Sequence, residues 1–528
     1  MTLTAPPPPA ATVNGADLLC DTLLAHGIDT CFANPGTSEM HFVAALDRKP
    51  AMRCVLGLFE GVVTGAADGY ARMADRPAAT LLHLGPGLGN GLANLHNARR
   101  AFTPMVNIVG DHATYHLQYD APLTSDIAGI ARSVSGWLRS SASADAVVAD
   151  AGDAIAAART APGRIATLIL PADAAWGETP AAPVIASPPP IPPKVTDADI
   201  EAIAGALRNG RASMLFLSGM ALRAGALEDA SRIAQATGAR LLAQQSNGRM
   251  QRGAGRVAIE RIRYRAADAV ADLAGVEQLI LVGAKTPVAF FAYPGKPSTF
   301  LDPGAEVLTL APNTHDLADA LARLARALEI PDSIRPILNE RARPDLPSGM
   351  LDIDKIATSI GALMPDQAIV VDEAVSSGRD FFRVTHGAAP HDFLQLTGGA
   401  IGIGLPLAAG AAIACPDRKV IALQADGSGM YTVQALWTHA REALDIVTVI
   451  FANQRYNILH QELANVGAGL PGRNAHAMLD LTEPTLDWVG LARAMGVEAA
   501  PATTAEEFNR LFAGAVSGKG PFLIEARI

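Results

Sequence analysis

The chain has 528 residues, 49% of them hydrophobic and 18% charged, and a formal net charge of −10. This length is too great for a single hydrophobic core and predicts two to four domains. The acidic balance and the lack of a basic stripe argue against a nucleic-acid partner. No uncharged apolar run approaches the roughly 20 residues of a membrane span, and four scattered cysteines predict a reducing, cytoplasmic location rather than a disulfide or zinc framework.

Helix and strand signals alternate along the first block of the chain. The first 15 residues, rich in proline and alanine, have neither the charged nor the apolar region of a secretory signal and predict a short disordered tail. The expected elements are a helix over 15–26, a strand over 30–33, a helix over 61–73, a strand over 78–83, a glycine-rich turn over 85–90 and a strand over 105–110.

Two proline-rich stretches, 186–195 and 343–349, predict linkers. They divide the chain into domains over 1–185, 186–345 and 346–528. Apolar strands are expected in the later blocks over 213–217, 278–283, 306–310 and 368–372. The predicted fold class is therefore α/β, with three doubly wound, mostly parallel-sheet domains.

The segment 420–459 carries the strongest pattern in the chain. An apolar strand over 420–424 leads into the turn Asp426-Gly427-Ser428-Gly429, an amphipathic helix over 431–443 and a β-branched strand over 446–451 that ends near Asn453. Because parallel strands bring their carboxyl ends to one edge, Asp426 and Asn453 are expected to converge there. Carboxylate and amide oxygens suit Mg²⁺, and the small-residue turn offers N–H groups to a diphosphate. An ordinary strand–helix–strand unit with a polar turn is the alternative.

This segment resembles the binding motif of the thiamine diphosphate (ThDP)-dependent decarboxylase and carboligase family. The chain as a whole is similar to its acetolactate synthase large subunit and benzoylformate decarboxylase branch. Two positions depart from the pattern, since Ala425 and Ala452 stand where the family usually has Gly and often has Asn. The resemblance implies Mg²⁺ ligands at Asp426, Asn453 and the Arg455 carbonyl, with Gly427 and Ser428 at the diphosphate.

Glu60 precedes a helix of small residues, in the sequence LFEGVVTGAADGYAR. A buried carboxylate must be paired or neutral, and the segment resembles the family's catalytic glutamate segment. That resemblance implies that Glu60 binds N1′ of the aminopyrimidine and promotes deprotonation of the thiazolium. A glutamate placed there only because it favours a helix start is the alternative.

The glycine-rich run 398–406 resembles the segment beneath the bend of the cofactor. The resemblance implies that the Gly399 carbonyl accepts from the 4′-amino group and that Ile401 wedges between the two rings. A plain strand-to-helix turn is the alternative. Further cofactor contacts are expected at Pro35, Ser376 and Tyr456, although Ser376 could equally be part of a polar turn.

Three polar residues of the first block are expected to face the substrate. His83 matches the position of a proton-handling histidine of benzoylformate decarboxylase-like enzymes. His112 is a second catalytic candidate, with His116 beside it, and Thr37 stands where the decarboxylases have a substrate-facing Ser. A satisfied core histidine is the alternative for His83.

Two features bear on the substrate. The middle-domain loop that carries a second catalytic histidine in benzoylformate decarboxylase here contains Phe290, Phe291 and Tyr293, which weakens a simple decarboxylase assignment. After the metal asparagine, Ile458 and Leu459 are expected to line the pocket, with His460 and Glu462 near its mouth. The Gly-Met segment and Trp typical of acetolactate synthases are absent from this region.

The predicted function is a Mg²⁺- and ThDP-dependent enzyme that decarboxylates a 2-oxo acid to an enamine and joins it to a second carbonyl compound, as acetolactate synthase does. The alternatives are a non-oxidative decarboxylase of the benzoylformate type and a catalytically idle partner protein of the same fold. FAD binding stays open, because the run 218–226 only weakly imitates a dinucleotide loop. The resemblance implies a homodimer or a tetramer built from dimers, in which Glu60 and Asp426 of one cofactor site come from different chains.

Overall fold

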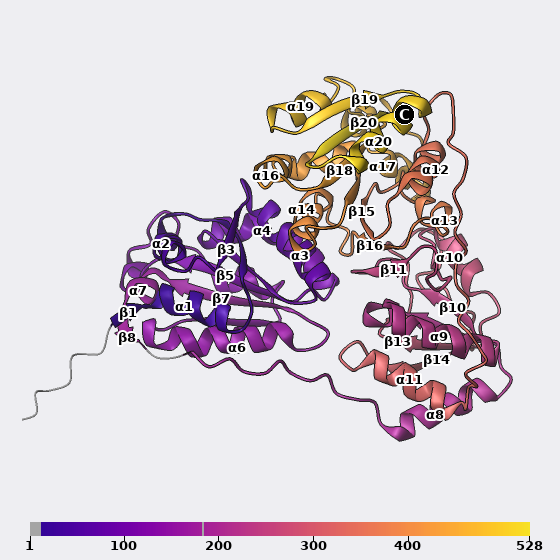
Figure 1. The fold of residues 1–528 in the computed structure, drawn as a ribbon, viewed down its shortest axis with the longest axis horizontal. Helices are drawn as coiled ribbons and strands as arrows, with labels where there is room; N and C mark the ends of the chain where they lie inside the picture. The colour runs from indigo at the N-terminus through magenta and orange to yellow at the C-terminus, as the bar shows by residue number, and fades with distance from the viewer. Residues whose placement is uncertain (1–11, 182–183) are drawn as a thin grey trace, which may run out of the picture. The chain divides into compact units, whose positions relative to one another are not determined.

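The computed structural model describes residues 12–181 and 184–528. The chain divides into two compact units, Met1–Pro190 and Ile191–Ile528 (Figure 1), and the predicted division into three domains stays a prediction. Most of the predicted N-terminal tail lies outside the described residues. The last residues of the predicted tail are described: β1 (Thr12–Asn14) pairs antiparallel with β8 (Glu178–Pro180). The prediction of a disordered tail was therefore wrong for residues 12–14.

Unit 1 is built on a six-stranded parallel sheet with the strand order β3-β2-β4-β5-β7-β6. Its strands are β2 (Thr30–Asn34), β3 (Arg53–Leu56), β4 (Ala78–Leu82), β5 (Met105–Asp111), β6 (Trp137–Ser140) and β7 (Ile165–Pro171). The main helices are α1 (Gly15–Ala25), α2 (Met40–Arg48), α3 (Glu60–Ala74), α4 (Leu84–Arg100), α5 (Ile127–Arg132), α6 (Val147–Arg159) and α7 (Ala172–Trp176). Short 3₁₀ turns are η1 (Thr37–Glu39), η2 (Thr114–Tyr119) and η3 (Ala144–Ala146).

Helices cover both faces of this sheet, as the alternation of side chains along β2 requires. Cys31 and Ala33 join a core that includes residues of α1 and α6. Phe32 points the other way, and its ring centroid lies 6.0 Å from that of Tyr70 on α3. Figure 1 shows α1 and α6 on one side of the strands and α3 and α4 on the other.

Two local predictions in this unit were wrong. The glycine-rich turn expected over 85–90 is the start of helix α4. Glu60, which was expected to precede the helix over 61–73, is the first residue of α3. Tertiary packing outweighs the low helix propensity of glycine here. Thr64 Oγ1 donates to the Gly91 carbonyl over 3.1 Å, and a Cβ added to Gly91 would lie 2.9 Å from Thr64 Cγ2, so α3 and α4 meet through their small residues.

Unit 2 contains two sheets. The smaller is parallel, in the order β12-β10-β9-β13-β14. Its strands are β9 (Ser213–Leu217), β10 (Arg240–Ala243), β12 (Glu260–Arg261), β13 (Gln278–Val282) and β14 (Glu306–Ala311). Its helices are α8 (Asp197–Arg208), η4 (Gly219–Leu222), α9 (Ala224–Thr237), α10 (Ala266–Leu273) and α11 (Leu317–Ala327).

The larger sheet runs β11-β16-β15-β17-β18-β20-β19, with only β11 antiparallel to its neighbour. Its strands are β11 (Met250–Arg252), β15 (Ala368–Glu373), β16 (His391–Gln395), β17 (Val420–Ala425), β18 (Ile446–Ala452), β19 (Glu498–Ala502) and β20 (Phe522–Arg527). Its helices are α12 (Ile353–Leu363), α13 (Phe381–Val384), α14 (Gly404–Ala414), α15 (Asp426–Gly429), η5 (Met430–Thr432), α16 (Ala435–Arg441), α17 (Asn457–Asn465), α18 (Arg473–Leu479), α19 (Trp488–Ala494) and α20 (Ala505–Ser517).

The continuous helix predicted over 431–443 was wrong. The chain forms the 3₁₀ turn η5 and then the shorter helix α16. Thr432 Oγ1 donates to the Gly402 carbonyl over 2.7 Å, and a Cβ on Gly402 would lie 2.6 Å from Tyr431 Cβ. The start of this segment is thus pressed against the glycine-rich run, which favours the tighter turn.

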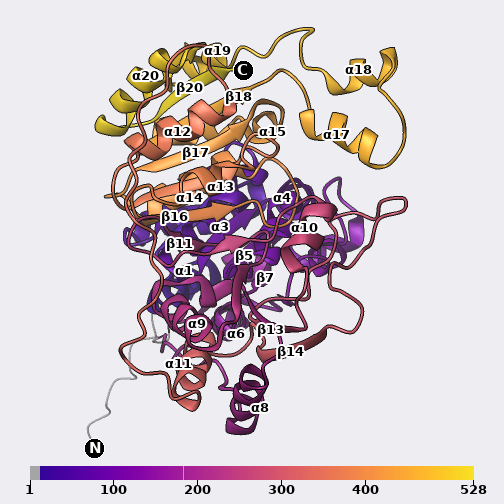
Figure 2. The ribbon, with the colours of Figure 1, turned by 90° about the vertical axis from the view of Figure 1, so that its right-hand side faces the viewer.

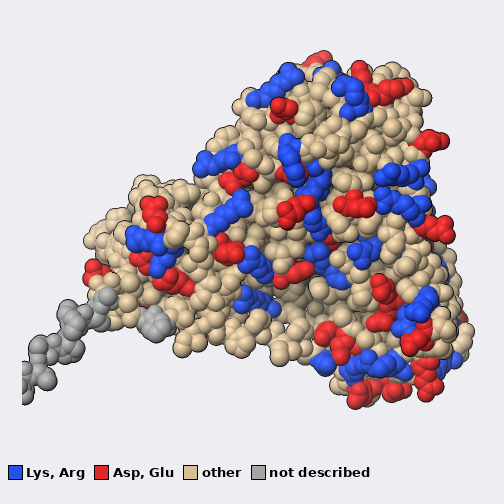
Figure 3. All heavy atoms as spheres, viewed as in Figure 1, with Lys and Arg blue, Asp and Glu red and all other residues tan. Residues whose placement is uncertain are grey.

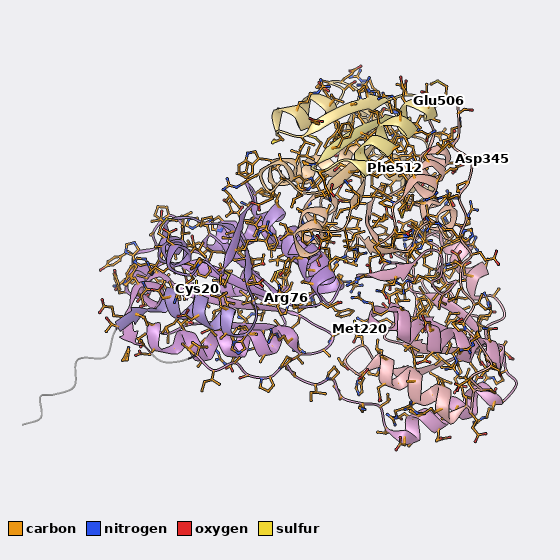
Figure 4. All side chains as sticks on the ribbon, in the orientation of Figure 1. Cys20, Arg76, Met220, Asp345, Glu506 and Phe512 are labelled. Carbon is orange, nitrogen blue, oxygen red and sulfur yellow. The ribbon has the colours of Figure 1, made fainter. Side chains whose placement is uncertain are left out.

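Each unit has its own buried core. In Figure 4, Cys20 marks α1 in unit 1 and Phe512 marks α20 in unit 2, and both side chains are fully buried. On the face drawn in Figure 3, acidic and basic side chains are interspersed over the described surface. Among the described residues, none of the helices is long and apolar enough to span a membrane.

Candidate active site

Several polar candidate residues of unit 1 follow the carboxyl ends of β2 and β4, where the strand order of the sheet reverses. In the sheet, β2 lies between β3 and β4, so the strand order reverses at β2. Open α/β sheets bind ligands at the carboxyl ends of the strands at such a point. Gly36 follows β2, and His83 follows β4 as the residue before α4. A Cβ on Gly36 would lie 2.3 Å from His83 Nδ1, so only glycine lets the backbone approach this ring so closely.

A buried carboxylate that the sequence analysis missed holds His83. Glu39 Oε2 lies 2.8 Å from His83 Nδ1 and accepts the Gly36 N–H over 2.7 Å. The Glu39 side chain is 1% exposed and His83 is 24% exposed, so the ring alone reaches the surface. Burial raises the pKa of Glu39, while the bonds from Gly36 and His83 oppose that rise. The three-residue spacing between Gly36 and Glu39 after a strand was the available signal.

Glu60 lies next to this pair of strands, at the start of α3, and is buried. Its Oε2 accepts from Asn90 Nδ2 over 3.0 Å. A Cβ on Gly87 would be 3.1 Å from Glu60 Oε1, so the glycine-rich start of α4 leaves room beside the carboxylate. Asn90 is a further site residue that the analysis of the sequence did not single out.

The remaining candidates of unit 1 lie on loops after β2 and β5. Pro35 is half-buried, and Thr37 is exposed at the start of η1. His112 follows β5, and its ring centroid lies 5.5 Å from that of His116. His112 Nε2 is buried and has no hydrogen-bond partner within residues 12–181 and 184–528. A buried ring nitrogen of this kind is suited to a bound ligand.

Asp426 forms the centre of a second group of residues, at the carboxyl edge of the large sheet in unit 2. It is buried as the first residue of α15, directly after β17. Its Oδ1 accepts the Gly427 N–H over 2.8 Å and its Oδ2 accepts the Gln454 N–H over 2.6 Å. Burial raises the pKa of Asp426 despite these bonds. No ion pair to Asp426 exists among the residues that the structure describes, so a cation would find an unneutralised carboxylate.

Asn453 follows β18, the strand next to β17, as predicted. Its Oδ1 accepts the Arg455 N–H over 3.2 Å. Gln454 between them has a φ of 56°, in the left-handed region that is uncommon for residues other than glycine. That conformation aims the Gln454 N–H at Asp426. The Arg455 carbonyl accepts from the Asn457 N–H over 2.9 Å, which leaves its second lone pair for a ligand.

Ser376 and Asn453 line one cavity of about 410 Å³, together with Ser377, Asp380, Arg455 and Asn457. Asn457 Nδ2 donates to Ser376 Oγ over 3.4 Å. Ser428 lies on the neighbouring turn, where its hydroxyl donates to the Ala425 carbonyl and accepts from Gln424 Nε2. Ser376, which follows β15, and Asn453, which follows β18, therefore line the same cavity.

Glu373 at the end of β15 supports the glycine-rich run. Its two carboxylate oxygens accept the N–H groups of Gly402 and Gly404, each over 2.5 Å. Burial raises the pKa of Glu373 to about 7. Gly399 is exposed with a φ of 80°, and Ile401 is half-buried. This carboxylate was missed because an acidic residue at a strand end carries no distinctive sequence pattern.

The predicted substrate-side residues lie on and near α17. Tyr456 packs against the turn after β17, since a Cβ on Gly427 would lie 2.5 Å from its ring. Ile458 is half-buried and Leu459 is 44% exposed. The aromatic loop lies within the same unit, where a Cβ on Gly399 would lie 2.7 Å from the ring of Phe290.

The residues of both units fit the cofactor that the sequence predicts. Unit 2 offers the buried carboxylate of Asp426 and the amide oxygen of Asn453 at neighbouring strand ends, and oxygen ligands of this kind suit Mg²⁺. In unit 1 the carboxylate of Glu60 is buried, and Gly87 leaves space beside it.

Comparisons with known proteins agree with this chemistry. Residues 13–130 match the family model of the thiamine pyrophosphate enzyme N-terminal TPP binding domain, and residues 376–526 match the C-terminal TPP binding domain. The chain belongs to this family of ThDP-dependent enzymes, within the branch of 2-oxo acid decarboxylases and acetolactate synthase-like proteins. The predicted fold class is confirmed as well.

Three relatives place the chain more closely. It is 53% identical to IlvX of Mycobacterium tuberculosis, a protein named provisionally as an acetolactate synthase large subunit, over 97% of this chain and 98% of that one. It is 30% identical to benzoylformate decarboxylase of Pseudomonas aeruginosa, over 96% and 97% of the two chains. A solved ThDP-dependent 4-hydroxybenzoylformate decarboxylase of Rhodococcus jostii RHA1 has a TM-score of 0.86 at 25% identity, covering 98% and 99%.

Proposed function

We propose that this chain is a Mg²⁺-dependent ThDP enzyme that decarboxylates a 2-oxo acid and transfers the remaining fragment to a second carbonyl compound, as an acetolactate synthase does. The buried Asp426, which has Asn453 on the next strand and backbone N–H donors but no ion pair within the described chain, is the observation that carries this proposal. The 53% identity to a relative named as an acetolactate synthase large subunit supports the carboligating outcome.

In this proposal the residues of unit 2 hold the charged end of the cofactor. Asp426, Asn453 and the Arg455 carbonyl bind Mg²⁺, while Gly427, Ser428 and Ser376 contact the diphosphate. Gly399 and Ile401 support the bend between the rings, and Tyr456 and Pro35 complete the contacts. When bound, the cofactor would supply a nucleophilic carbon and an electron sink for decarboxylation.

The residues of unit 1 move and hold protons. Glu60 hydrogen-bonds the pyrimidine nitrogen and holds the proton there. His83, fixed at Nδ1 by Glu39, presents its other nitrogen to the substrate. His112 is the second candidate, because its Nε2 is buried without a hydrogen-bond partner in the described parts of the chain. Thr37, Ile458 and Leu459 line the substrate pocket.

A non-oxidative decarboxylase of the benzoylformate type is the second candidate function. The Glu39–His83 pair favours it, because a positioned histidine can protonate the intermediate before a second carbonyl compound arrives. The loop with Phe290, Phe291 and Tyr293 opposes it, since these side chains offer no imidazole for proton transfer.

We further propose a cytoplasmic homo-oligomer, a dimer or a dimer of dimers, in which Glu60 and Asp426 of one site come from different chains. Glu60 belongs to unit 1 and Asp426 to unit 2, so an arrangement of this kind needs no change within either unit. FAD is not part of the proposal.

Product analysis separates the two candidate functions. The chain is incubated with Mg²⁺, ThDP and either pyruvate or benzoylformate, and CO₂ and products are followed by NMR. We expect acetolactate from pyruvate. Free benzaldehyde without any carboligation product would instead establish the decarboxylase. Absence of CO₂ from both, with ThDP bound, would refute both substrate assignments while leaving the cofactor assignment in place.

A further inference from the structure

Two histidines and an aspartate converge on α17 and α18, outside the residues assigned above to the cofactor. His460 Nε2 lies 2.8 Å from Asp480 Oδ1, and His476 Nδ1 lies 2.9 Å from Asp480 Oδ2. The two imidazole rings are 5.5 Å apart. Figure 2 shows α17 and α18 as two short helices that a loop connects. Three potential metal ligands, from α17, α18 and the residue that follows α18, therefore lie close together.

The spacing of these atoms suits a small divalent ion. One ligand atom from each residue lies within 4.8 Å of the others. Ligands placed about 2.1 Å from a zinc ion are about 3.0–3.4 Å apart. Side-chain shifts that shorten the longest separation by up to about 1.4 Å would therefore bring all three atoms to one ion.

The donor set also determines which metal would bind. Two imidazole nitrogens and one carboxylate suit Zn²⁺ and neighbouring transition ions, whereas Mg²⁺ prefers oxygen ligands alone. His460 is 18% exposed, while His476 is 51% and Asp480 32% exposed. The cluster is therefore open to solvent on one side, which leaves a coordination position for water.

We propose that His460, His476 and Asp480 form a binding site for a divalent transition-metal ion of the Zn²⁺ type. The site is additional to the Mg²⁺ site at Asp426 and does not depend on the substrate of the enzyme.

A metal bound there would connect the helix pair to the cofactor turn. The Tyr456 N–H donates to the Leu479 carbonyl over 2.8 Å, and the Leu481 N–H donates to the Gln454 carbonyl over 2.7 Å. Asp480 therefore lies on a segment that is hydrogen-bonded to the turn following Asn453. Fixing His460 and His476 to Asp480 would hold α17, α18 and this turn as one body.

Calorimetric titration with Zn²⁺ tests the proposal. The protein is the holoenzyme without a polyhistidine tag, saturated with Mg²⁺ and freed of unbound ThDP, because free diphosphate would chelate zinc. We expect one equivalent of Zn²⁺ to bind per chain. In His476→Gln and in Asp480→Asn, affinity for this equivalent should fall by more than about 100-fold, since losing even an outer partner of a metal ligand costs 10–100-fold.

Matched variants control for other binding groups. His116→Gln removes half of the second close histidine pair, and His386→Gln removes an exposed histidine that bonds only to a carbonyl of its own turn. Both should keep the zinc equivalent. Zinc bound by the exposed Cys54 would be common to all the variants and cancel in the comparison.

Limited proteolysis gives a second measurement. The loop 466–472 between the helices contains Leu470, which is 92% exposed. Zn²⁺ should slow cleavage of this loop in the native chain and leave the His476→Gln chain unaffected. Because the His476 side chain is half exposed, this variant should fold normally, and circular dichroism checks that it does. Zinc binding that survives in His476→Gln and Asp480→Asn, or no zinc binding by the native chain, would overturn the proposal.

Discussion

Glu39 sets the position of His83, the histidine that we propose faces the substrate. It is 1% exposed, and one of its oxygens bonds to both Gly36 and His83. The other oxygen, Oε1, has no hydrogen-bond partner among the described residues, and a Cβ on Gly110 would overlap it. Burying a carboxylate costs free energy unless it is paired. We therefore infer that the role of Glu39 is to position the His83 ring.

The Glu39→Gln variant tests this positioning role. We expect kcat to fall by about tenfold or more, because the amide keeps the size of the side chain but removes its charge beside His83, the proposed general acid–base. ThDP affinity should stay unchanged, because no assigned cofactor residue contacts Glu39. Steady-state kinetics at several pH values provide the measurement, and Glu178→Gln, an exposed substitution in the same unit, is the control. A drop in ThDP affinity with normal kcat would contradict this role.

Glu373 makes stability depend on pH. Its pKa is raised from 4.5 to about 7 by burial. Between these values the folded chain keeps a proton that the unfolded chain has lost, so stability falls as pH rises from about 5 to 7 and then levels off. The difference corresponds to at most about 3 kcal/mol.

Chemical denaturation of the cofactor-free chain between pH 5 and 8 measures this effect. The Glu373→Gln variant should lose this component of the pH dependence. Buried His391 and His439 have lowered pKa values, about 3 and about 4, and act in the opposite direction below pH 6.5. The comparison therefore uses the difference between variant and native chain. Identical pH profiles for the two proteins would exclude Glu373 as the cause.

At the scale of single elements, the helix α20 depends on its first turn. The N-cap residue of α20 is Thr504, whose Oγ1 accepts the Glu507 N–H over 3.3 Å. In return, Glu507 Oε2 accepts the Thr504 N–H over 3.2 Å. Phe508 and Phe512 of this helix are fully buried in the core of unit 2. The reciprocal pair thus fixes the start of a helix whose apolar face the core requires.

Thr504→Ala should destabilise the start of α20 by about 1 kcal/mol. Hydrogen exchange of the amides in the first turn should become about fivefold faster. Thr504→Ser keeps the hydroxyl and serves as the control, with exchange close to that of the native chain. Equal exchange in the alanine and serine variants would mean that the hydroxyl bond contributes nothing.

The strands were predictable because their signal is local. β9 has the predicted bounds, and β15, β17 and β18 differ by a single residue, since strands buried on both faces read as continuous apolar runs. The start of α4 was not predictable from glycine content, because Gly87 and Gly91 serve contact with α3 rather than a turn. Local propensity cannot report such a distant partner.

The positions of Asp426 and Asn453 were predictable for a similar reason. Asp426 and Asn453 each follow a recognisable strand, and neighbouring parallel strands place them at one edge. Glu39, Asn90 and Glu373 were not, because each acts on a residue far away in the sequence or on backbone groups of a distant turn. Only the folded arrangement shows what these side chains contact.

At the scale of the whole molecule, the proposed oligomer predicts complementation between inactive variants. Glu60→Gln carries its lesion in unit 1 and Asp426→Asn carries its lesion in unit 2. If each site takes one unit from each chain, a mixed dimer has one site with both lesions and one with neither. Random exchange of subunits should restore up to about a quarter of native activity. Activity that stays at the level of the separate variants, after exchange is verified by mass, would contradict a shared site.

We propose that this chain decarboxylates 2-oxo acids through a cofactor that Glu60 activates. CO₂ release from pyruvate and other 2-oxo acids by native and Glu60→Gln protein, both saturated with Mg²⁺ and ThDP, tests it most directly. We predict CO₂ release by the native chain from at least one of these acids. The variant should bind ThDP as the native chain does but release CO₂ at least about 100-fold more slowly. Equal rates for the two proteins would contradict the role of Glu60. No CO₂ from any 2-oxo acid with the cofactor bound would contradict the proposed decarboxylation.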